Sequence, residues 1–199
     1  MFSIRRPAEE KISALRSSAA SQQLTYPFEG FTRSDDPEQA VPPGYQLDRH
    51  QVVLGHGEET FQRAAEAIRQ WRMFPTEVAE LYDRQTPIDV AEVVAVLFHG
   101  YGLWTLNPAR IIYTIDEREL DWRFGFAYGT LPGHLARGEE LFLVERSGET
   151  DEVTFSIVAV SRPSHLFSWI GYPLVRREQR RFRRLSGEAM QAAVTSDQD

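Results

Sequence analysis

The spacing of apolar residues predicts four helical segments. They cover residues 7–20, 57–75, 77–82 and 166–190. In the first two, apolar side chains share one helical face, which consists of Ile12, Leu15 and Ala19 in the first and of Phe61, Ala64, Ala65, Ile68 and Trp71 in the second. Pro75 is expected to end the second helix. The last segment is expected to bury Trp169, Leu174, Phe182, Leu185 and Ala189, with Gly171 and Pro173 kinking or dividing its start.

Short runs typical of strands fill the middle of the chain. They span residues 51–54, 90–98, 110–115, 124–131, 141–145 and 153–161. The spacing between the later runs leaves no room for crossover helices, so the predicted sheet is mainly antiparallel. Such a sheet has a face to cover, and the C-terminal helix is the obvious cover. The predicted fold class is therefore α+β, a curved antiparallel sheet wrapped around a long C-terminal helix. This arrangement often encloses a ligand cavity.

Composition limits the class of protein. The chain has 199 residues, 42% of them hydrophobic and none of them cysteine, which indicates one globular domain without disulfides or thiolate chemistry. Its longest apolar run, Val93 to Phe98, is too short to span a membrane. Arg5 and Arg6 precede a polar stretch rather than the apolar core of a secretory signal, so we expect a cytoplasmic protein.

The charges are unevenly distributed. The net charge is −7, but residues 176–184 hold six Arg and one Glu, a local charge of +5, so the rest of the chain carries −12. The acidic remainder would oppose a phosphate backbone, and no stacking aromatics alternate with the arginines, so we do not predict nucleic-acid binding. The arginines are expected to pair with acidic side chains on the sheet or to solvate the helix.

The familiar catalytic and cofactor motifs are incomplete. The stretch from Gly55 to Gly57 lies where a dinucleotide fingerprint would, but it lacks the third glycine, and two carboxylates follow it in the first helical turn. The five histidines show no metal-ligand spacing, and no Gly-x-Ser-x-Gly elbow is present. We therefore predict no metal and no cofactor, and we interpret the glycine motif as a turn before a charged helix start.

Residues 124–142 contain the densest candidate chemistry. On a strand, alternate residues Phe124, Phe126, Tyr128 and Thr130 share one face, while the small residues opposite them allow a helix, side chain or ligand to approach closely. His134 follows a Pro-Gly turn and should lie on a loop. Glu139 and Glu140 should point to opposite faces, so at most one enters the interior. A buried Glu beside His134 would form an acid–base pair, whereas a solvated hairpin tip is the simpler interpretation.

A combination of motifs resembles one specific family. These motifs are Tyr128-Gly-Thr-Leu-Pro-Gly-His134, Gly138-Glu-Glu140 with Phe142, Ser161-Arg-Pro163, Pro173-Leu-Val-Arg176 and Gln179-Arg-Arg-Phe182. Upstream, Leu24-Thr-Tyr26, Pro43-Gly-Tyr45 and Leu54-Gly-His-Gly57 agree with it. The resemblance, over about residues 24–190, is to the uncharacterised bacterial and plant family called "domain of unknown function nineteen-ninety". It implies no established activity.

The order of elements is also similar to that of the START-like superfamily of helix-grip proteins. That likeness implies a curved sheet folded around a long C-terminal helix over an apolar cavity, and it is an analogy of fold. We accordingly predict an N-terminal helical extension over residues 1–23, one START-like domain over residues 24–190, and a flexible tail over residues 191–199.

Three functional hypotheses follow. The first is a protein that binds a small apolar or aromatic molecule between the sheet and the C-terminal helix, through Tyr26, Phe126, Tyr128, Thr130, His134, Glu140, Arg162, Trp169, Gln179 and Phe182. The alternative is a cyclase- or hydrolase-type enzyme that uses His134 and Glu140 for acid–base chemistry. The third is a module that binds an acidic protein through Arg176–Arg184. The oligomeric state does not follow from the sequence.

Overall fold

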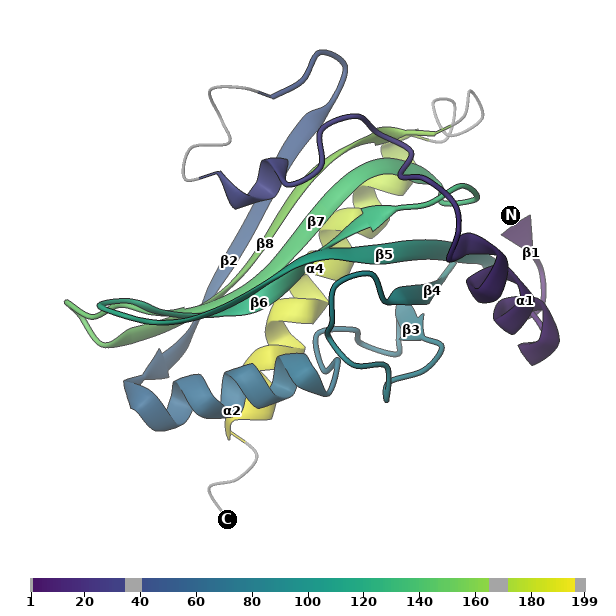
Figure 1. Cartoon of the computed structure of the whole chain (residues 1–199). Coiled ribbons are helices and arrows are strands. Elements are labelled where there is room, and N and C mark those ends of the chain that lie inside the picture. Colours follow the sequence, from purple (N-terminus) through teal and green to yellow (C-terminus); the bar gives the residue numbers. More distant parts are fainter. Residues whose placement is uncertain (1, 35–40, 165–171, 196–199) are drawn as a thin grey trace.

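One curved antiparallel sheet organises the chain (Figure 1). The computed structural model describes residues 2–34, 41–164 and 172–195. The strand order is β2-β8-β7-β6-β5-β4-β3, and the short β1 pairs with β5. The strands are β1 (Phe2–Ser3), β2 (Gln46–His56), β3 (Ala79–Leu81), β4 (Val93–Gly100), β5 (Leu103–Arg118), β6 (Trp122–Thr130), β7 (Ala136–Arg146) and β8 (Glu152–Pro163). All the pairings are antiparallel, as predicted.

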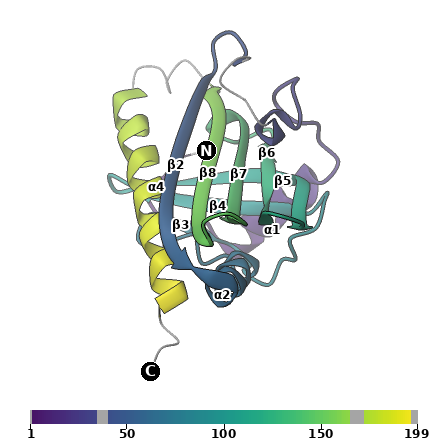
Figure 2. The ribbon, with the colours of Figure 1, turned by 90° about the vertical axis from the view of Figure 1, so that its left-hand side faces the viewer.

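Helices lie against both faces of this sheet (Figures 1 and 2). They are α1 (Glu9–Ala19), the short 3-10 helix η1 (Phe31–Arg33), α2 (Gly57–Arg69) and α4 (Tyr172–Thr195). The inner face carries α2 and α4, whose apolar side chains share the main core with Phe126, Phe142 and Phe155 of the sheet. The outer face carries α1, whose Ile12 is fully buried against β4 and β5. The predicted α+β arrangement, a curved sheet with a long C-terminal helix, is confirmed.

Strand alternation separates two sets of side chains. In β6, Phe126 and Tyr128 belong to the main core on the inner face, whereas Ala127 belongs to a smaller cluster on the outer face. Gly129 also faces outward, and a Cβ there would overlap the Tyr26 hydroxyl group. Gly129 therefore makes room for the side chain of Tyr26 rather than for a ligand.

Several predicted boundaries were wrong. Strands extend beyond their apolar runs, because the ladder hydrogen bonds of β2, β5 and β7 continue through polar residues. The helix predicted over residues 77–82 is instead β3, an edge strand paired with residues 96–98 of β4. A three-residue strand is too short to show an alternating pattern. Helix α2 ends at Arg69 rather than near Pro75, because Trp71 adopts a left-handed backbone (φ 56°) that turns the chain while its indole is buried.

The C-terminal helix also differs from the prediction in its last residues and in the exposure of Leu174. It continues through Thr195, so residues 191–195 of the predicted flexible tail are helical. Val194 is 4% exposed and packs in the main core, and Gln191 Nε2 donates to the Val53 carbonyl group. These contacts hold the last helical turn on the domain. Leu174, expected to be buried, is 52% exposed, because it lies in the first turn of α4 at the edge of the space between the helix and the sheet.

Replacing Val194 tests whether the last turn belongs to the core. Val194→Asp places a charge in an apolar site and is expected to lower the free energy of unfolding by about 2–4 kcal/mol. Ala192→Asp adds the same charge two residues earlier at an exposed position and should change it by less than about 1 kcal/mol. Urea unfolding followed by circular dichroism measures both. Equal effects would show that the turn at Val194 is not packed.

Candidate functional site

A cavity of about 420 Å³ lies between α4 and the strands β4 to β8. Its apolar wall includes Val78, Phe98, Leu103, Leu135, Ala159 and Phe182. Seven of the ten predicted site residues line it, namely Tyr128, Thr130, His134, Glu140, Arg162, Gln179 and Phe182. Residues from three strands (β6, β7 and β8), from one loop and from α4 thus meet at one cavity.

Exposed apolar side chains lie at the rim of this cavity. Tyr101, Leu103 and Leu174 line it and are 59%, 40% and 52% exposed. Tyr101 and Gly102 form the turn between β4 and β5, and both have positive φ angles (53° and 74°), as a two-residue hairpin turn requires. Glycine or asparagine is the usual residue there, and a bulky side chain is uncommon. The turn therefore places an aromatic ring at the rim at some conformational cost.

A row of paired residues crosses the inner face beneath the first half of α4. Asp48 on β2 pairs with Ala159 on β8, Ala159 pairs with Glu140 on β7, and Glu140 pairs with Tyr128 on β6. Because directly paired residues point to the same face of a sheet, two carboxylates and a phenol are brought together with a small methyl group between them. We refer to Asp48, Ala159, Glu140 and Tyr128 as the polar row.

Two arginines of α4 neutralise one end of the polar row. Both terminal nitrogens of Arg176 donate to the Asp48 carboxylate, and Arg183 Nη2 lies 3.5 Å from Asp48 Oδ1. Burial alone would raise the pKa of Asp48, but the hydrogen bonds from Arg176 and the charges of both arginines together lower it. Asp48 therefore stays ionised and ties α4 to the edge of the sheet.

The arginine-rich segment divides into two groups. Arg176 and Arg183 turn inward to Asp48, while Arg177, Arg180, Arg181 and Arg184 are exposed. Of the exposed group, Arg181 and Arg184 pair along the helix with Glu178 and Glu188. The expected pairing with the sheet is therefore confirmed for Arg176 and Arg183, which meet Asp48 on β2, while the other four arginines lie at the exposed surface of the helix.

Glu140 has a different environment from Asp48. It accepts a 2.7 Å hydrogen bond from the Tyr128 hydroxyl group through Oε2. Within the described part of the chain, no cation lies within ion-pair distance of it. Burial raises the pKa of Glu140, which the Tyr128 hydrogen bond and the charge of Arg183 offset only in part. Burial also raises the pKa of Tyr128, so the phenol keeps its proton and remains the donor.

His134 lies on the β6–β7 loop, as predicted, but its side chain has its own partner. Its Nδ1 accepts a 3.0 Å hydrogen bond from the Ala136 amide, so the neutral ring carries its proton on Nε2. Burial lowers the pKa of His134 to about 4. Among the described residues no hydrogen bond joins His134 to Glu140, although both line the cavity.

The other polar residues of the cavity are also engaged. Gln179 Oε1 accepts a hydrogen bond from Arg176. The guanidinium group of Arg162 lies over the ring of Tyr45, 4.7 Å from its centroid. Thr130 accepts a hydrogen bond from the Gly138 amide. These side chains are held in place by the protein itself.

Three predicted site residues do not line the cavity. Phe126 is fully buried in the core, where its ring packs against Trp71 and Phe142. Tyr26 lies on the outer face, beside a second hollow of about 450 Å³. Trp169 lies outside the described residues.

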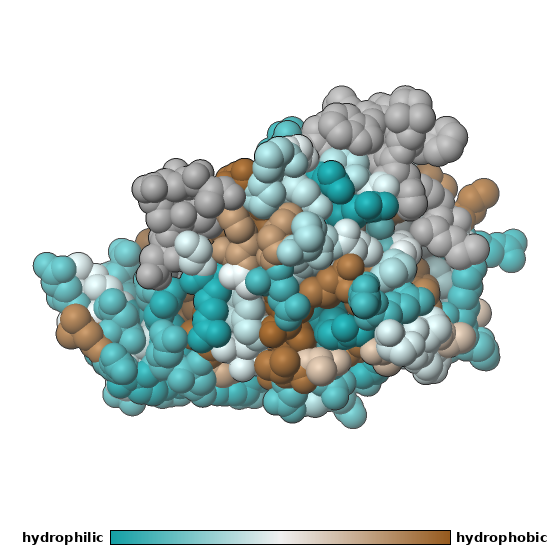
Figure 3. All heavy atoms as spheres, turned by 45° about the horizontal axis from the view of Figure 1, so that its top comes forward, coloured by the Kyte–Doolittle hydropathy of each residue, from teal (hydrophilic) through white to brown (hydrophobic). Residues whose placement is uncertain are grey.

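Figure 3 shows one face of the molecule. Most of this surface is hydrophilic, and apolar side chains reach it near the middle.

The sequence did not reveal the role of Glu139. It is 2% exposed on the outer face, where Tyr26 Oη, the amides of Gly30 and Thr32, and the Thr32 hydroxyl group all donate to its carboxylate. These four hydrogen bonds attach the segment around η1 to β7. The adjacent glutamates therefore differ in role, since Glu139 fastens a loop and Glu140 faces the cavity.

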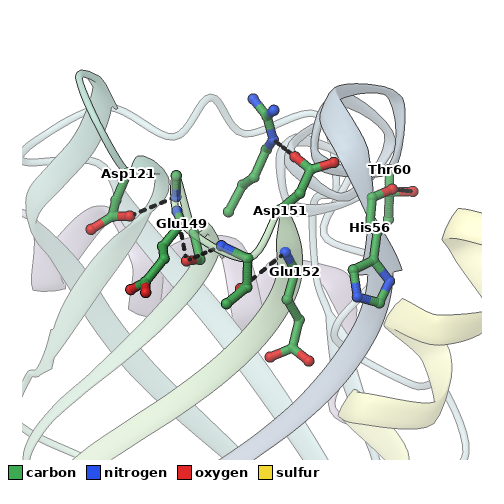
Figure 4. Close-up of polar contacts among 10 residues, drawn as sticks. His56, Thr60, Asp121, Glu149, Asp151 and Glu152 are labelled. Carbon is green, nitrogen blue, oxygen red and sulfur yellow. Dashed lines mark hydrogen bonds and ion pairs between the residues drawn. The ribbon is translucent and has the colours of Figure 1, made fainter.

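The glycine motif before α2 has a structural role. The Gly57 amide donates to the carbonyl group of Asp151, and the Thr60 hydroxyl group donates to that of His56, so the β7–β8 hairpin covers the start of the helix. Figure 4 shows that the side chains of Asp121, Glu149 and Glu152 point in different directions rather than toward one centre. The predicted charged helix start is confirmed by Glu58 and Glu59 in the first turn of α2, but instead of a turn the strand β2 runs through His56 directly into the helix.

Within residues 2–34, 41–164 and 172–195, no group of three or more His, Asp and Glu side chains is arranged to hold a metal ion. In the same residues, no helix is both long enough and apolar enough to cross a membrane.

The curved antiparallel sheet lies beneath a long C-terminal helix with a cavity between them, which is the helix-grip arrangement that the sequence predicts. The crystal structure of TTHA0849 from Thermus thermophilus is similar, with a TM-score of 0.52 and 13% identity over 77% of this chain and 100% of that chain. At this identity the likeness shows the fold alone. Residues 25–189 match the family described as domain of unknown function (DUF1990), and the chain belongs to that family.

Relatives in this family occur in both eukaryotes and bacteria. A UPF0548 protein of Dictyostelium discoideum is 33% identical over 212 residues, which cover 100% of this chain and 98% of the relative. A UPF0548 protein of Deinococcus radiodurans is 35% identical over 191 residues, which cover 91% of this chain and 92% of the relative. The predicted family membership is confirmed.

Removing the negative charge of Glu139 should loosen the outer face. In Glu139→Gln the amide nitrogen cannot accept a hydrogen bond, so at least one buried donor loses its partner, and we expect a loss of about 2–4 kcal/mol in unfolding free energy. Glu145→Gln, on the same strand but in a partly exposed pair with Arg123, should cost less than about 1 kcal/mol. Chemical denaturation measures both, and equal losses would contradict the assigned role of Glu139.

His134 should make stability depend on pH. The unfolded chain takes up a proton near pH 6.5 and the folded protein only near pH 4, so the unfolded state binds more protons in this window and stability falls as the pH falls through it. His134→Asn offers a similar acceptor to the Ala136 amide but does not titrate. Between pH 7 and pH 4.5 the wild type should lose about 1–3 kcal/mol more than this variant. Urea unfolding at both pH values tests this, and parallel losses would contradict it.

Proposed function

We propose that the protein binds a small apolar or aromatic molecule in the cavity between α4 and the sheet. The cavity of about 420 Å³ is the observation that carries the proposal. It falls in the range of roughly 300–1,000 Å³ typical of small-molecule sites. Its wall is mainly apolar and includes Phe98 and Phe182, and a few fixed polar groups converge on it.

The geometry favours binding over catalysis. An acid–base mechanism by His134 and Glu140 would need the two side chains to act on one substrate, but each is bonded elsewhere, to the Ala136 amide and to the Tyr128 hydroxyl group. The low pKa of His134, about 4, also makes it a weak base. The enzyme hypothesis therefore has less support than the binding hypothesis.

The third hypothesis and the location stay predictions. Two of the six arginines in residues 176–184 are engaged with Asp48. This leaves Arg177, Arg180, Arg181 and Arg184 as the exposed part of a surface for an acidic partner. The cytoplasmic location rests on the sequence alone.

Native mass spectrometry tests binding directly. The protein as purified should carry an extra mass that is lost on denaturation. Ala159→Phe places a ring inside the cavity, between Asp48 and Glu140 of the polar row, and should remove at least nine-tenths of the bound mass. Ala8→Phe makes the same change at an exposed position before α1 and should leave it unchanged.

Two results would contradict the proposal. One is a bound mass that survives Ala159→Phe in a folded protein. The other is the absence of any bound mass, together with no change in thermal unfolding temperature when apolar aromatic compounds are added. Ligands that bind the folded state raise that temperature by mass action.

A further inference from the structure

The two carboxylates of the polar row are satisfied to different degrees. Both oxygens of Asp48 accept hydrogen bonds from Arg176, and Arg183 lies beside it. Glu140 accepts one hydrogen bond, from Tyr128 to Oε2. In the described part of the chain, Glu140 Oε1 has no hydrogen-bond partner. A carboxylate offers about four acceptor positions, so Glu140 is short of donors.

There is room for a ligand atom next to Glu140. Ala159 is the residue paired with Glu140 on β8, and both line the cavity. Because Ala159 has only a methyl group, it leaves space between the carboxylates of Asp48 and Glu140. Phe182 of α4 lines the same cavity and supplies an apolar surface. A ligand whose polar group binds Glu140 would therefore place its apolar part against Phe182.

Charged groups of both signs surround the cavity. Glu140 and Glu178 line it, with Asp48 behind them, against the three lining arginines Arg162, Arg176 and Arg183. Glu139 also touches the cavity, but its carboxylate is bonded on the outer face. A charged ligand would bring a further charge into a partly buried site that already holds charged groups of both signs, and removing that charge from water costs free energy. The site therefore favours an uncharged molecule.

We infer that the ligand is an uncharged apolar compound with a hydroxyl group, an alcohol or a phenol, whose O–H donates a hydrogen bond to Glu140 Oε1. This inference rests on the proposed function and names its ligand class. A carbonyl or ether group cannot donate to the carboxylate, and a protonated amine would add a charge. A hydroxyl oxygen can also accept a hydrogen bond. The neutral ring of His134, which lines the same cavity, carries its hydrogen on Nε2 and could donate it to that oxygen.

Three naphthalene compounds of similar shape separate these possibilities. They are 2-naphthol, 2-methylnaphthalene and 2-(aminomethyl)naphthalene, the last a cation at pH 7. Binding to the full-length protein is followed by the fluorescence of the naphthalene ring. The wild type should bind 2-naphthol at least tenfold more tightly than 2-methylnaphthalene, and more tightly than the amine.

The variants assign this preference to Glu140. Tyr128→Phe/Glu140→Leu removes both partners of one hydrogen bond, so no orphaned group is left, and should reduce the preference for 2-naphthol to less than twofold. Glu140→Gln keeps the shape of the side chain and serves if the double variant does not fold. It should reduce the preference at least threefold, because Tyr128 then occupies its one acceptor oxygen. Glu145→Leu, a matched change elsewhere on β7, should retain the full preference.

Each other outcome has a definite meaning. If both neutral compounds bind to the wild type equally well, the hydroxyl inference is wrong while the binding function stands. Tighter binding of the amine than of 2-naphthol would overturn the inference in favour of a cationic ligand. A preference that persists in the folded Glu140 variants would also overturn it. If none of the three compounds binds, both the inference and the proposed function fail.

Discussion

The attachment of α4 to the sheet through Asp48 is the interaction on which the cavity depends. The second half of α4 packs into the main core with Met190 and Val194. The first half is fixed differently, by Arg176 and Arg183, which reach Asp48 near the start of β2. Phe182, also in this half, packs against Phe74 and Phe98. Space remains beneath this half of the helix, and Phe182 projects into it from above.

The two faces of β7 show how one strand serves both structure and binding. Glu139 and Glu140 are neighbours, and the pleat sends them to opposite sides of the sheet. On the outer face, Glu139 is satisfied by four donors from one segment. On the inner face, Glu140 has Tyr128 alone, and this face borders the cavity. The contrast in hydrogen bonding, rather than the residue type, marks Glu140 as the functional candidate.

Much of the fold and part of the site could be predicted from the sequence, because both depend on local periodicity. Alternation along β6 placed Tyr128 on the inner face, and the Pro-Gly turn placed His134 on a loop. The hydrogen-bond and ion-pair partners of the site residues could not be predicted from local periodicity. Asp48 lies 128 residues before Arg176, and only strand register brings them together. Tyr26 was wrongly assigned to the cavity. Because it is far from β6 in the sequence, the pattern along the chain does not show that its side chain lies on the outer face, where it bonds to Glu139.

A crystal structure of the protein as purified, without added ligand, would test the central claim most directly. We expect electron density for a non-protein molecule between α4 and the sheet. That molecule should pack against Phe182 and have an oxygen atom within hydrogen-bond distance of Glu140 Oε1. Closure of this space by movement of α4 onto Ala159, with Phe182 filling it, would contradict the claim that the fold maintains a binding cavity.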